Sequence, residues 1–343
     1  MRINFASDNA APVCPELMQA IQTENTGPAL GYGNDDTTRR MEQSFTDLFG
    51  CDLKAYPVAT GTAANVLGLS MMTPPYGSVY CHELSHIQLD ECGAPEFFTD
   101  GAKLALLEGG NGKITAPDLE AALAVSGRGV VHHVQPAAIS LTQVTECGTL
   151  YEPDEISAIS EVARRHGLGV HMDGARLANS VAALGCSVAD ITWKAGVDVL
   201  SFGGTKNGAM SVEAVIFFDQ AKAAEFEFRR KRGAHLFSKL RYLSAQLEAY
   251  LKNDLWLGLA AHANAMAQRL SEGLQAQGNH HLHYPTQANI VFVTLSVPVI
   301  EKLERAGFLF YVMGPREEGQ VRLVTSWNTT EEEVNLFLSH VGS

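Results

Sequence analysis

At 343 residues, the chain is too long for one simple core and suits a large α/β domain plus a smaller one. Its hydrophobic content of 46% and charged content of 18% are those of an ordinary folded protein and exclude a disordered chain. The net charge of −13 argues against nucleic acid or an anionic membrane as a partner, because either would attract a basic face.

Six cysteines are scattered along the chain without CxxC spacing, which indicates reduced thiols rather than a disulfide framework. No run approaches the roughly 20 apolar residues of a membrane-spanning helix. The polar residues that follow Phe5 give no targeting segment. We therefore expect a cytoplasmic protein with no nucleic-acid or membrane partner.

The first 50 residues are predicted to form an arm, broken by prolines and glycines and closed by an amphipathic helix over 36–49. From Tyr56 to Phe218, short apolar runs alternate with helical stretches, as in the βαβ units of a mostly parallel sheet. Strands are predicted at 54–58, 78–81, 137–143, 169–172, 197–202 and 214–218. Helices are predicted at 63–71, 116–124, 152–166 and 188–195.

The chain changes character after Asp219. The stretch 221–277 is predicted to be almost continuously helical, with interruptions near Gly233 and at Asn253. A small α/β domain is then predicted from strands near 289–295 and 320–324 and helices near 297–306 and 330–341. The predicted organisation is an N-terminal arm and helix at 1–50, a large domain at 51–245 and a small C-terminal domain at 246–343.

The turn over 60–65, with the sequence TGTAAN, follows a predicted strand and opens a helix. Free backbone N–H groups and the helix dipole at such a turn bind a phosphate dianion, and Gly61 permits a close approach. The same turn is common as a purely structural feature. It indicates a phosphate site only when other groups of the same site accompany it.

Two later motifs each place a reactive group at the end of a short apolar strand. The strand 169–172 leads into Asp173, and the strand 197–202 leads into a small-residue turn that carries Lys206. A lysine amine that forms a Schiff base and a carboxylate that holds a proton on a pyridine nitrogen are what pyridoxal phosphate (PLP) needs as an electron sink. Arg176, three residues after Asp173, is placed to reach the phenolate oxygen of the same cofactor.

The segment from His82 to His86 matches the HExxH pattern of zinc metalloproteases. Here it directly follows a predicted strand, whereas the zinc motif belongs within a long helix. A zinc hydrolase that uses His82 and His86 is therefore a distant alternative, and no metal is expected. In a PLP site, His86 would instead stack on the pyridine ring and move protons near the substrate.

An amino-acid substrate brings a carboxylate, for which the bidentate fork of arginine is the natural partner. Arg322 interrupts the apolar strand 321–326, where a charge is costly unless it faces a cavity or a partner. We therefore expect Arg322 to bind the carboxylate, with Ser7 assisting. The basic cluster 229–232 is either a solvated helix face or a group that reaches a phosphate, in this subunit or a neighbouring one.

Together, these motifs resemble the threonine aldolase family of fold-type I PLP-dependent enzymes, and specifically its low-specificity L-threonine aldolase branch. They run in the family's order over almost the whole chain: SDN at 7–9, YGND at 32–35, TGTAAN at 60–65, SHI at 85–87, HMDGAR at 171–176, SFGGTKNG at 201–208 and VRLVT at 321–325. The HMDGAR and lysine motifs are specific. The resemblance implies a large domain with a mostly parallel sheet flanked by helices, plus a small C-terminal α/β domain.

The resemblance also implies roles around the cofactor. Lys206 would carry the Schiff base and His86 would stack on the ring. Asp173 would hold the pyridine nitrogen and Arg176 the ring oxygen. Gly61 and Thr62 would hold the phosphate.

Family members are usually homotetramers, built from dimers whose active sites lie at the dimer interface. Ser7 and Arg322 would hold the substrate carboxylate in each site. The resemblance therefore leads us to expect Tyr32 and Arg232 to contribute across the interface, with Tyr32 binding the substrate and Arg232 reaching the cofactor.

The implied reaction is the reversible aldol cleavage of a β-hydroxy-α-amino acid, L-threonine or L-allo-threonine, to glycine and acetaldehyde. A β-eliminating lyase that acts on a substituted alanine is the alternative within the PLP class, because Asp173 and Lys206 would serve it equally well. The chain departs from shorter bacterial relatives at one point: they place a second active-site histidine after the strand 137–143. This chain has Thr145 and Glu146 there, so proton transfer is left to His86 and water or to one of these two residues.

Overall fold

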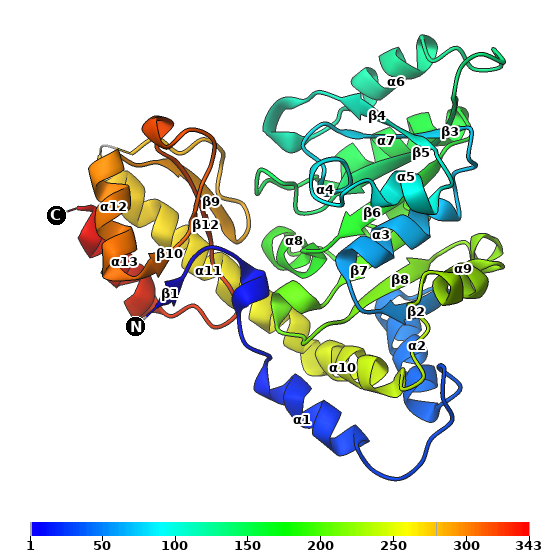
Figure 1. Ribbon diagram of the computed structural model, residues 1–343, viewed down its shortest axis with the longest axis horizontal. Helices are drawn as coiled ribbons and strands as arrows, with labels where there is room; N and C mark the ends of the chain where they lie inside the picture. Colours follow the sequence, from blue (N-terminus) through cyan, green and yellow to red (C-terminus); the bar gives the residue numbers. More distant parts are fainter. Residues whose placement is uncertain (1, 279, 343) are drawn as a thin grey trace.

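The computed structural model describes residues 2–278 and 280–342. Figure 1 shows a large lobe built on a seven-stranded sheet and a small lobe that holds both ends of the described chain. No helix in these described ranges is long and apolar enough to cross a membrane. The architecture is the predicted α/β fold with a mostly parallel central sheet.

The strands of the large sheet lie in the order β2, β8, β7, β6, β5, β3 and β4. Their bounds are Lys54–Val58 (β2), Glu213–Phe217 (β8), Val199–Gly203 (β7), Gly169–Gly174 (β6), Gln135–Thr142 (β5), Gly77–His82 (β3) and Lys103–Leu107 (β4). β8 is antiparallel to both of its neighbours, and the other pairs are parallel. The predicted strands of this sheet are confirmed, whereas the half-exposed edge strand β4 was missed because its sequence lacks a polar–apolar alternation.

Successive residues of the central strands face two different helical layers, as the two-residue period of a strand requires. Val199 packs against helix α3, and the next residue, Leu200, belongs to the core on the opposite face. The first layer contains α3 (Gly61–Ser70), α4 (His86–Leu89), α5 (Ala94–Phe98) and α9 (Phe226–Arg232). The second contains α2 (Asp36–Phe49), α6 (Ala116–Ala124), α7 (Pro153–Arg165) and α8 (Leu177–Leu184).

The small lobe combines the C-terminal part of the chain with its first residues. Its antiparallel sheet has the order β11 (Tyr311–Val312), β12 (Gln320–Val324) and β9 (Ile290–Thr294), covered by α12 (Val297–Ala306) and α13 (Glu331–Val341). β1 (Ile3–Asn4) pairs in parallel with β10 (Phe308–Leu309). Phe5 then packs against Phe308 and Phe337, so the start of the predicted arm is part of this lobe's core.

Long helices connect the two lobes (Figure 1). α10 (Arg241–Leu251) packs against α1 (Pro15–Glu24), a helix inside the predicted arm, and α11 (Leu255–Ala276) follows after the predicted interruption at Asn253. Trp256 near the start of α11 lies in the core of the large lobe, and Leu270 near its end lies in that of the small lobe. Because one helix serves both cores, the division of the chain at residue 245 stays a prediction.

The predicted helix over 188–195 is wrong. The helix in this region is α8, which ends at Gly185, and only a short 3-10 turn, η3 (Trp193–Ala195), follows. The side chains of Ser187 and Asp190 accept hydrogen bonds from each other's backbone N–H groups, at 3.2 and 3.3 Å. Such a reciprocal pair would cap a helix, but the backbone of Thr192 lies outside the helical region, at φ −127° and ψ −107°, so the segment stays a series of turns.

Candidate active site

The predicted groups gather at one edge of the large sheet. Asp173 lies at the carboxyl end of β6, Lys206 lies in the 3-10 turn η4 (Thr205–Asn207) after β7, and His86 opens α4 after β3. The amino end of α3 follows β2 at the same edge, because β2 runs parallel to β7. In parallel sheets this edge is where binding sites form.

Asp173 is buried and held by two donors. Its Oδ1 accepts from the backbone N–H of Ala175 at 3.0 Å, and its Oδ2 accepts from Asn65 Nδ2 at 2.8 Å. Each oxygen of an ionised carboxylate accepts about two hydrogen bonds. The carboxylate is therefore fixed in direction and retains capacity for one more donor, such as a protonated ring nitrogen.

Lys206 has no hydrogen bond or ion pair within the described chain. Burial lowers its pKa, and the neighbouring Arg176 guanidinium lowers it further, against the opposite effects of Asp8 and Asp173. A lowered pKa increases the fraction of neutral amine, which is the form that attacks an aldehyde. The geometry and charge around Lys206 therefore suit a reactive amine.

His86 is anchored by two carboxylates. Its ring atom Nδ1 lies 2.8 Å from Glu91 Oε1, and its backbone N–H donates to Glu146 Oε1 at 2.8 Å. The hydrogen bond to Glu91 raises the pKa of His86 above its ordinary value, against the lowering effect of burial. Burial raises the pKa of Glu146 to about 7.

Thr145 is turned away from these groups. Its hydroxyl is hydrogen-bonded to Thr149 Oγ1 at 2.7 Å and to the carbonyl of Asn111 at 3.3 Å. Of the two residues that stand where shorter relatives have a histidine, Glu146 is thus the one beside His86.

Arg176 is bound by a residue of the N-terminal segment. Its Nε and a terminal nitrogen donate to the carboxylate of Asp8 at 2.7 and 3.0 Å, and Asn289 Nδ2 donates to the same carboxylate at 3.1 Å. Burial raises the pKa of Asp8, but the pair with Arg176 outweighs it and holds that pKa below the usual range. Ser7, the preceding residue, accepts from the N–H of Asn9 and caps the short turn η1 (Asp8–Ala10).

Arg322, on β12, has its guanidinium 5.9 Å from the ring centre of Tyr311. Burial lowers the pKa of Arg322, and the charge of Arg176 lowers it further. Two arginines from different lobes therefore influence each other's charge, and one buried carboxylate, Asp8, acts on both.

The turn that precedes α3 is suited to an anion. Thr60 caps the helix by accepting from Ala63 N–H at 3.1 Å, whereas the N–H groups of Gly61 and Thr62 have no partner among the described residues. A Cβ placed on Gly61 would meet no atom within 4 Å, so the space in front of the helix is open. The helix dipole and free donors favour a phosphate there.

Tyr32 and Arg232 are not brought into this cluster. Tyr32 is half exposed, with Lys231 Nζ 5.0 Å from its ring centre, and Arg232 is exposed at the end of α9. Neither makes a hydrogen bond or ion pair with Lys206 or Asp173 in the described part of this chain. Their role in the site stays a prediction.

The zinc alternative is wrong. His82 is a buried residue of β3, not of a helix, and both of its ring nitrogens are used by the backbone: Nε2 with the carbonyl of Gly109 at 3.1 Å and Nδ1 with the N–H of Leu84 at 3.1 Å. His82 and His86 therefore do not form a pair of ligands.

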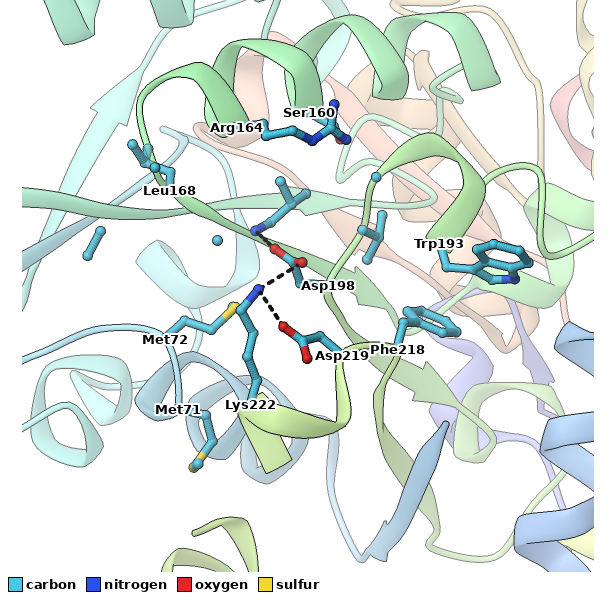
Figure 2. Close-up of a pocket in the computed structure, with 16 residues that line it drawn as sticks. Met71, Met72, Ser160, Arg164, Leu168, Trp193, Asp198, Phe218, Asp219 and Lys222 are labelled. Atoms are coloured by element: carbon cyan, nitrogen blue, oxygen red, sulfur yellow. Dashed lines mark hydrogen bonds and ion pairs between the residues drawn. The ribbon is translucent and has the colours of Figure 1, made fainter. Parts of the chain in front are cut away.

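A cavity of about 660 Å³ lies at the opposite edge of the sheet, where β6 and β7 begin. Figure 2 shows Lys222 in it, bound to Asp198 at 2.9 Å and to Asp219 at 3.5 Å. Its lysine is thus neutralised by two carboxylates, unlike Lys206.

Comparison with known proteins identifies the family. The family model described as "Beta-eliminating lyase" matches residues 4–296. A "Low specificity L-threonine aldolase" of Pseudomonas aeruginosa is 44% identical, over 96% of this chain and 94% of its own. The chain belongs to the threonine aldolases of this family.

Solved structures agree with the family assignment. The threonine aldolase of Leishmania major superimposes with a TM-score of 0.93 at 30% identity, covering 99% of this chain and 98% of its own. A serine palmitoyltransferase of Sphingomonas wittichii shares the fold, with a TM-score of 0.74, 16% identity, and coverage of 99% and 86%. As a threonine aldolase family member, the protein is a PLP-dependent lyase.

Several residues of the site carried no signal in the sequence patterns. Asp8, Asn65, Glu91 and Asn289 join groups that lie far apart along the chain, such as Asn65 and Asp173. Asp8 and Asn65 do lie inside two of the family motifs, SDN and TGTAAN, and their place there could have indicated that they belong to the site. Glu91 and Asn289 had no comparable clue.

Proposed function

We propose that the protein catalyses the reversible cleavage of a β-hydroxy-α-amino acid, L-threonine or L-allo-threonine, to glycine and acetaldehyde. The observation that carries this proposal is the pairing of an uncompensated lysine, Lys206, with the held carboxylate of Asp173 at one sheet edge. It occurs in a chain 44% identical to a low-specificity L-threonine aldolase.

The residues present fit the cofactor. The free N–H groups of Gly61 and Thr62 and the open space before α3 suit its phosphate, and the remaining acceptor capacity of Asp173 suits its pyridine nitrogen. Lys206 would offer the amine for its aldehyde, and Arg176, whose charge acts on Lys206, would hold the ring oxygen. When bound, PLP supplies an electron sink for the carbon that loses its substituent.

The residues of the chain bind and orient the substrate. Arg322, with Ser7 next to Asp8 of the Asp8–Arg176 pair, would hold the carboxylate and so fix which bond at Cα is broken. His86 accepts the proton of the β-hydroxyl, and the C–O bond gains double-bond character as the Cα–Cβ bond breaks. A proton returned to Cα completes glycine.

Elimination from a substituted alanine is the second candidate, because the matching family model is described as a beta-eliminating lyase. Product analysis separates the two reactions. Aldol cleavage gives glycine and an aldehyde in equal amounts, whereas elimination gives pyruvate and ammonia.

We further propose a cytosolic homotetramer built from dimers with shared sites. Large apolar side chains are exposed at Leu30, Leu89, Phe97 and Phe228. Leu30 and Phe228 lie close in the sequence to Tyr32 and Arg232, which are exposed as well. Mixing two inactive variants, Lys206→Ala and Arg232→Ala, tests the shared site. Hybrid dimers carry one intact site, so mixing should restore up to about a quarter of the wild-type activity if random dimers form.

The test of the cofactor and lysine is spectroscopic. The purified protein should show a visible absorption band that disappears on borohydride reduction, with a pyridoxyl adduct mapped to Lys206. A protein that stays colourless after PLP is added contradicts the proposal.

A further inference from the structure

A chain of hydrogen bonds joins His86 to Asp173 through Glu91 and Asn65. Glu91 Oε1 lies 2.8 Å from His86 Nδ1 and accepts from Asn65 Nδ2 at 2.9 Å. The same Asn65 nitrogen donates to Asp173 Oδ2 at 2.8 Å. One amide group therefore gives an N–H to each of two buried carboxylates and separates charges that would otherwise repel.

Glu91 sits in an environment that is costly for a carboxylate. Its side chain is 0% exposed, its only ion-pair partner in the described chain is His86, and its Oε2 has no hydrogen-bond partner. Burying a charge with so little compensation costs free energy. The surface pair of Glu120 and His166, with 44% and 27% of the side chains exposed, makes a similar bond without that cost.

The bond to Glu91 decides which ring nitrogen of His86 is free. An ionised carboxylate only accepts hydrogen bonds, so Nδ1 must carry a hydrogen. Nε2 has no partner among the described residues, and the backbone N–H of His86 is fixed separately by Glu146. Nε2 is consequently the atom that can exchange a proton with a ligand.

We propose that Glu91 is a positioning residue that keeps Nδ1 of His86 protonated and its ring oriented, so that Nε2 takes up the β-hydroxyl proton, with Asn65 holding Glu91 in place. This inference rests on the proposed aldol cleavage. In the step, the O–H bond breaks, an N–H bond forms at Nε2, and the electron pair stays on the oxygen. The protonated ring then returns a proton to the site.

The charged groups that face His86 come from four elements. They are Glu91 after α4, Glu146 after β5, Asp173 at the end of β6 and Lys206 after β7. Of these four groups, only Glu91 is hydrogen-bonded to the ring. Its replacement should therefore change the pKa and orientation of the ring, while the hydrogen bond from the backbone N–H of His86 to Glu146 remains.

The test compares Glu91→Gln with wild-type holoenzyme and with Glu120→Gln as the matched control. The amide of glutamine can donate to Nδ1, which would place the ring hydrogen on Nε2 and block it as a base. We expect kcat to fall about 10–100-fold. The acid limb of the kcat/KM profile should move about one pH unit lower, because the ring loses a neighbouring negative charge. Glu120→Gln should leave both unchanged.

A second readout does not depend on activity. Diethyl pyrocarbonate acylates neutral imidazole, so the pH midpoint for labelling of the His86 peptide reports the pKa of that ring. We expect the midpoint to fall in Glu91→Gln and to be retained in Glu91→Asp, which keeps the charge. The proposal is overturned if the labelling midpoint and the acid limb of the kcat/KM profile are both unchanged in Glu91→Gln. If Glu91→Gln does not fold, a labelling midpoint in Glu91→Asp that falls below that of the wild type would overturn it instead. Failure of the wild-type protein to cleave any β-hydroxy amino acid sinks the aldolase assignment instead, and the labelling midpoint still decides the role of Glu91.

Discussion

Lys206 and Lys222 follow two adjacent strands of the same sheet and end in opposite environments. β7 and β8 are antiparallel, so Lys206 lies at the site edge and Lys222 lies at the other edge, in the cavity of Figure 2. Lys222 is bound by Asp198 and Asp219, whereas Lys206 has no ion pair among the described residues. The difference teaches that direct pairing with a carboxylate makes a lysine structural, and that burial without such a pair leaves its amine available for chemistry.

Replacement of Lys206 should give the largest effect. Lys206→Ala should lower kcat by about 10³-fold or more, because the amine proposed to form the Schiff base is lost. Rates of acetaldehyde release at saturating substrate measure it. Lys222→Ala is the matched control at the other edge of the sheet. A comparable loss of kcat in that variant would contradict the difference drawn between the two lysines.

Asp173→Asn should have the second-largest effect. The amide cannot stabilise a positive charge on the ring nitrogen, and we expect kcat to fall about 10²–10³-fold, the size typical for one electrostatic contact to a reacting centre. Steady-state kinetics and the position of the visible absorption band report the change. Asp198→Asn removes a carboxylate from the other edge and should change kcat less than twofold.

Glu213→Gln should change how the stability of the folded protein depends on pH. Burial raises the pKa of this carboxyl to about 7, so between its unfolded value of about 4.3 and pH 7 the folded protein keeps a proton that the unfolded chain loses. Raising the pH through this window therefore destabilises the wild-type protein. Glutamine stays neutral and can still accept from Gly204 N–H, a bond of 2.7 Å in the wild type.

The measurement is thermal unfolding at pH 5 and pH 8. The Tm of Glu213→Gln minus the Tm of the wild type should be larger at pH 8 than at pH 5. An equal difference at both pH values contradicts a raised pKa for Glu213.

Lys222→Met should have the smallest effect. Its ammonium group is partly exposed, so loss of the pair with Asp198 should lower the free energy of unfolding by at most about 1 kcal/mol. Urea unfolding measures this change, and kcat should be that of the wild type. A decrease of several kcal/mol in the free energy of unfolding would contradict the description of this contact as a partly exposed ion pair.

The strands and most helices followed from the sequence because their signals are local. β2 at Lys54–Val58 and α6 at Ala116–Ala124 have the predicted bounds, since apolar alternation and proline at the helix start act within a few residues. The segment over 188–195 has a helix-like apolar pattern, but the backbone of Thr192 leaves the helical region. The apolar pattern alone does not show this change in backbone conformation.

The site was predictable only as far as it follows strand ends. Asp173, Lys206 and His86 were placed at one edge because parallel strands bring such ends together. The bonds of Glu91 to His86 and of Asp8 to Arg176 depend on how helices and lobes pack, which periodicity does not encode. The roles of Tyr32 and Arg232 stay predictions, since they concern a second subunit.

The pairing of β1 with β10 sets an order on biosynthesis. Ile3 leaves the ribosome well before its partner Phe308, which is made about three hundred residues later. Asp8, five residues after Ile3, also waits for Asn289 from the small lobe before its contacts around Arg176 are complete. An emerging chain therefore carries Lys206 and Asp173 long before Asn289 and Arg322 are made, so the contacts around Arg176 are among the last that synthesis allows to form.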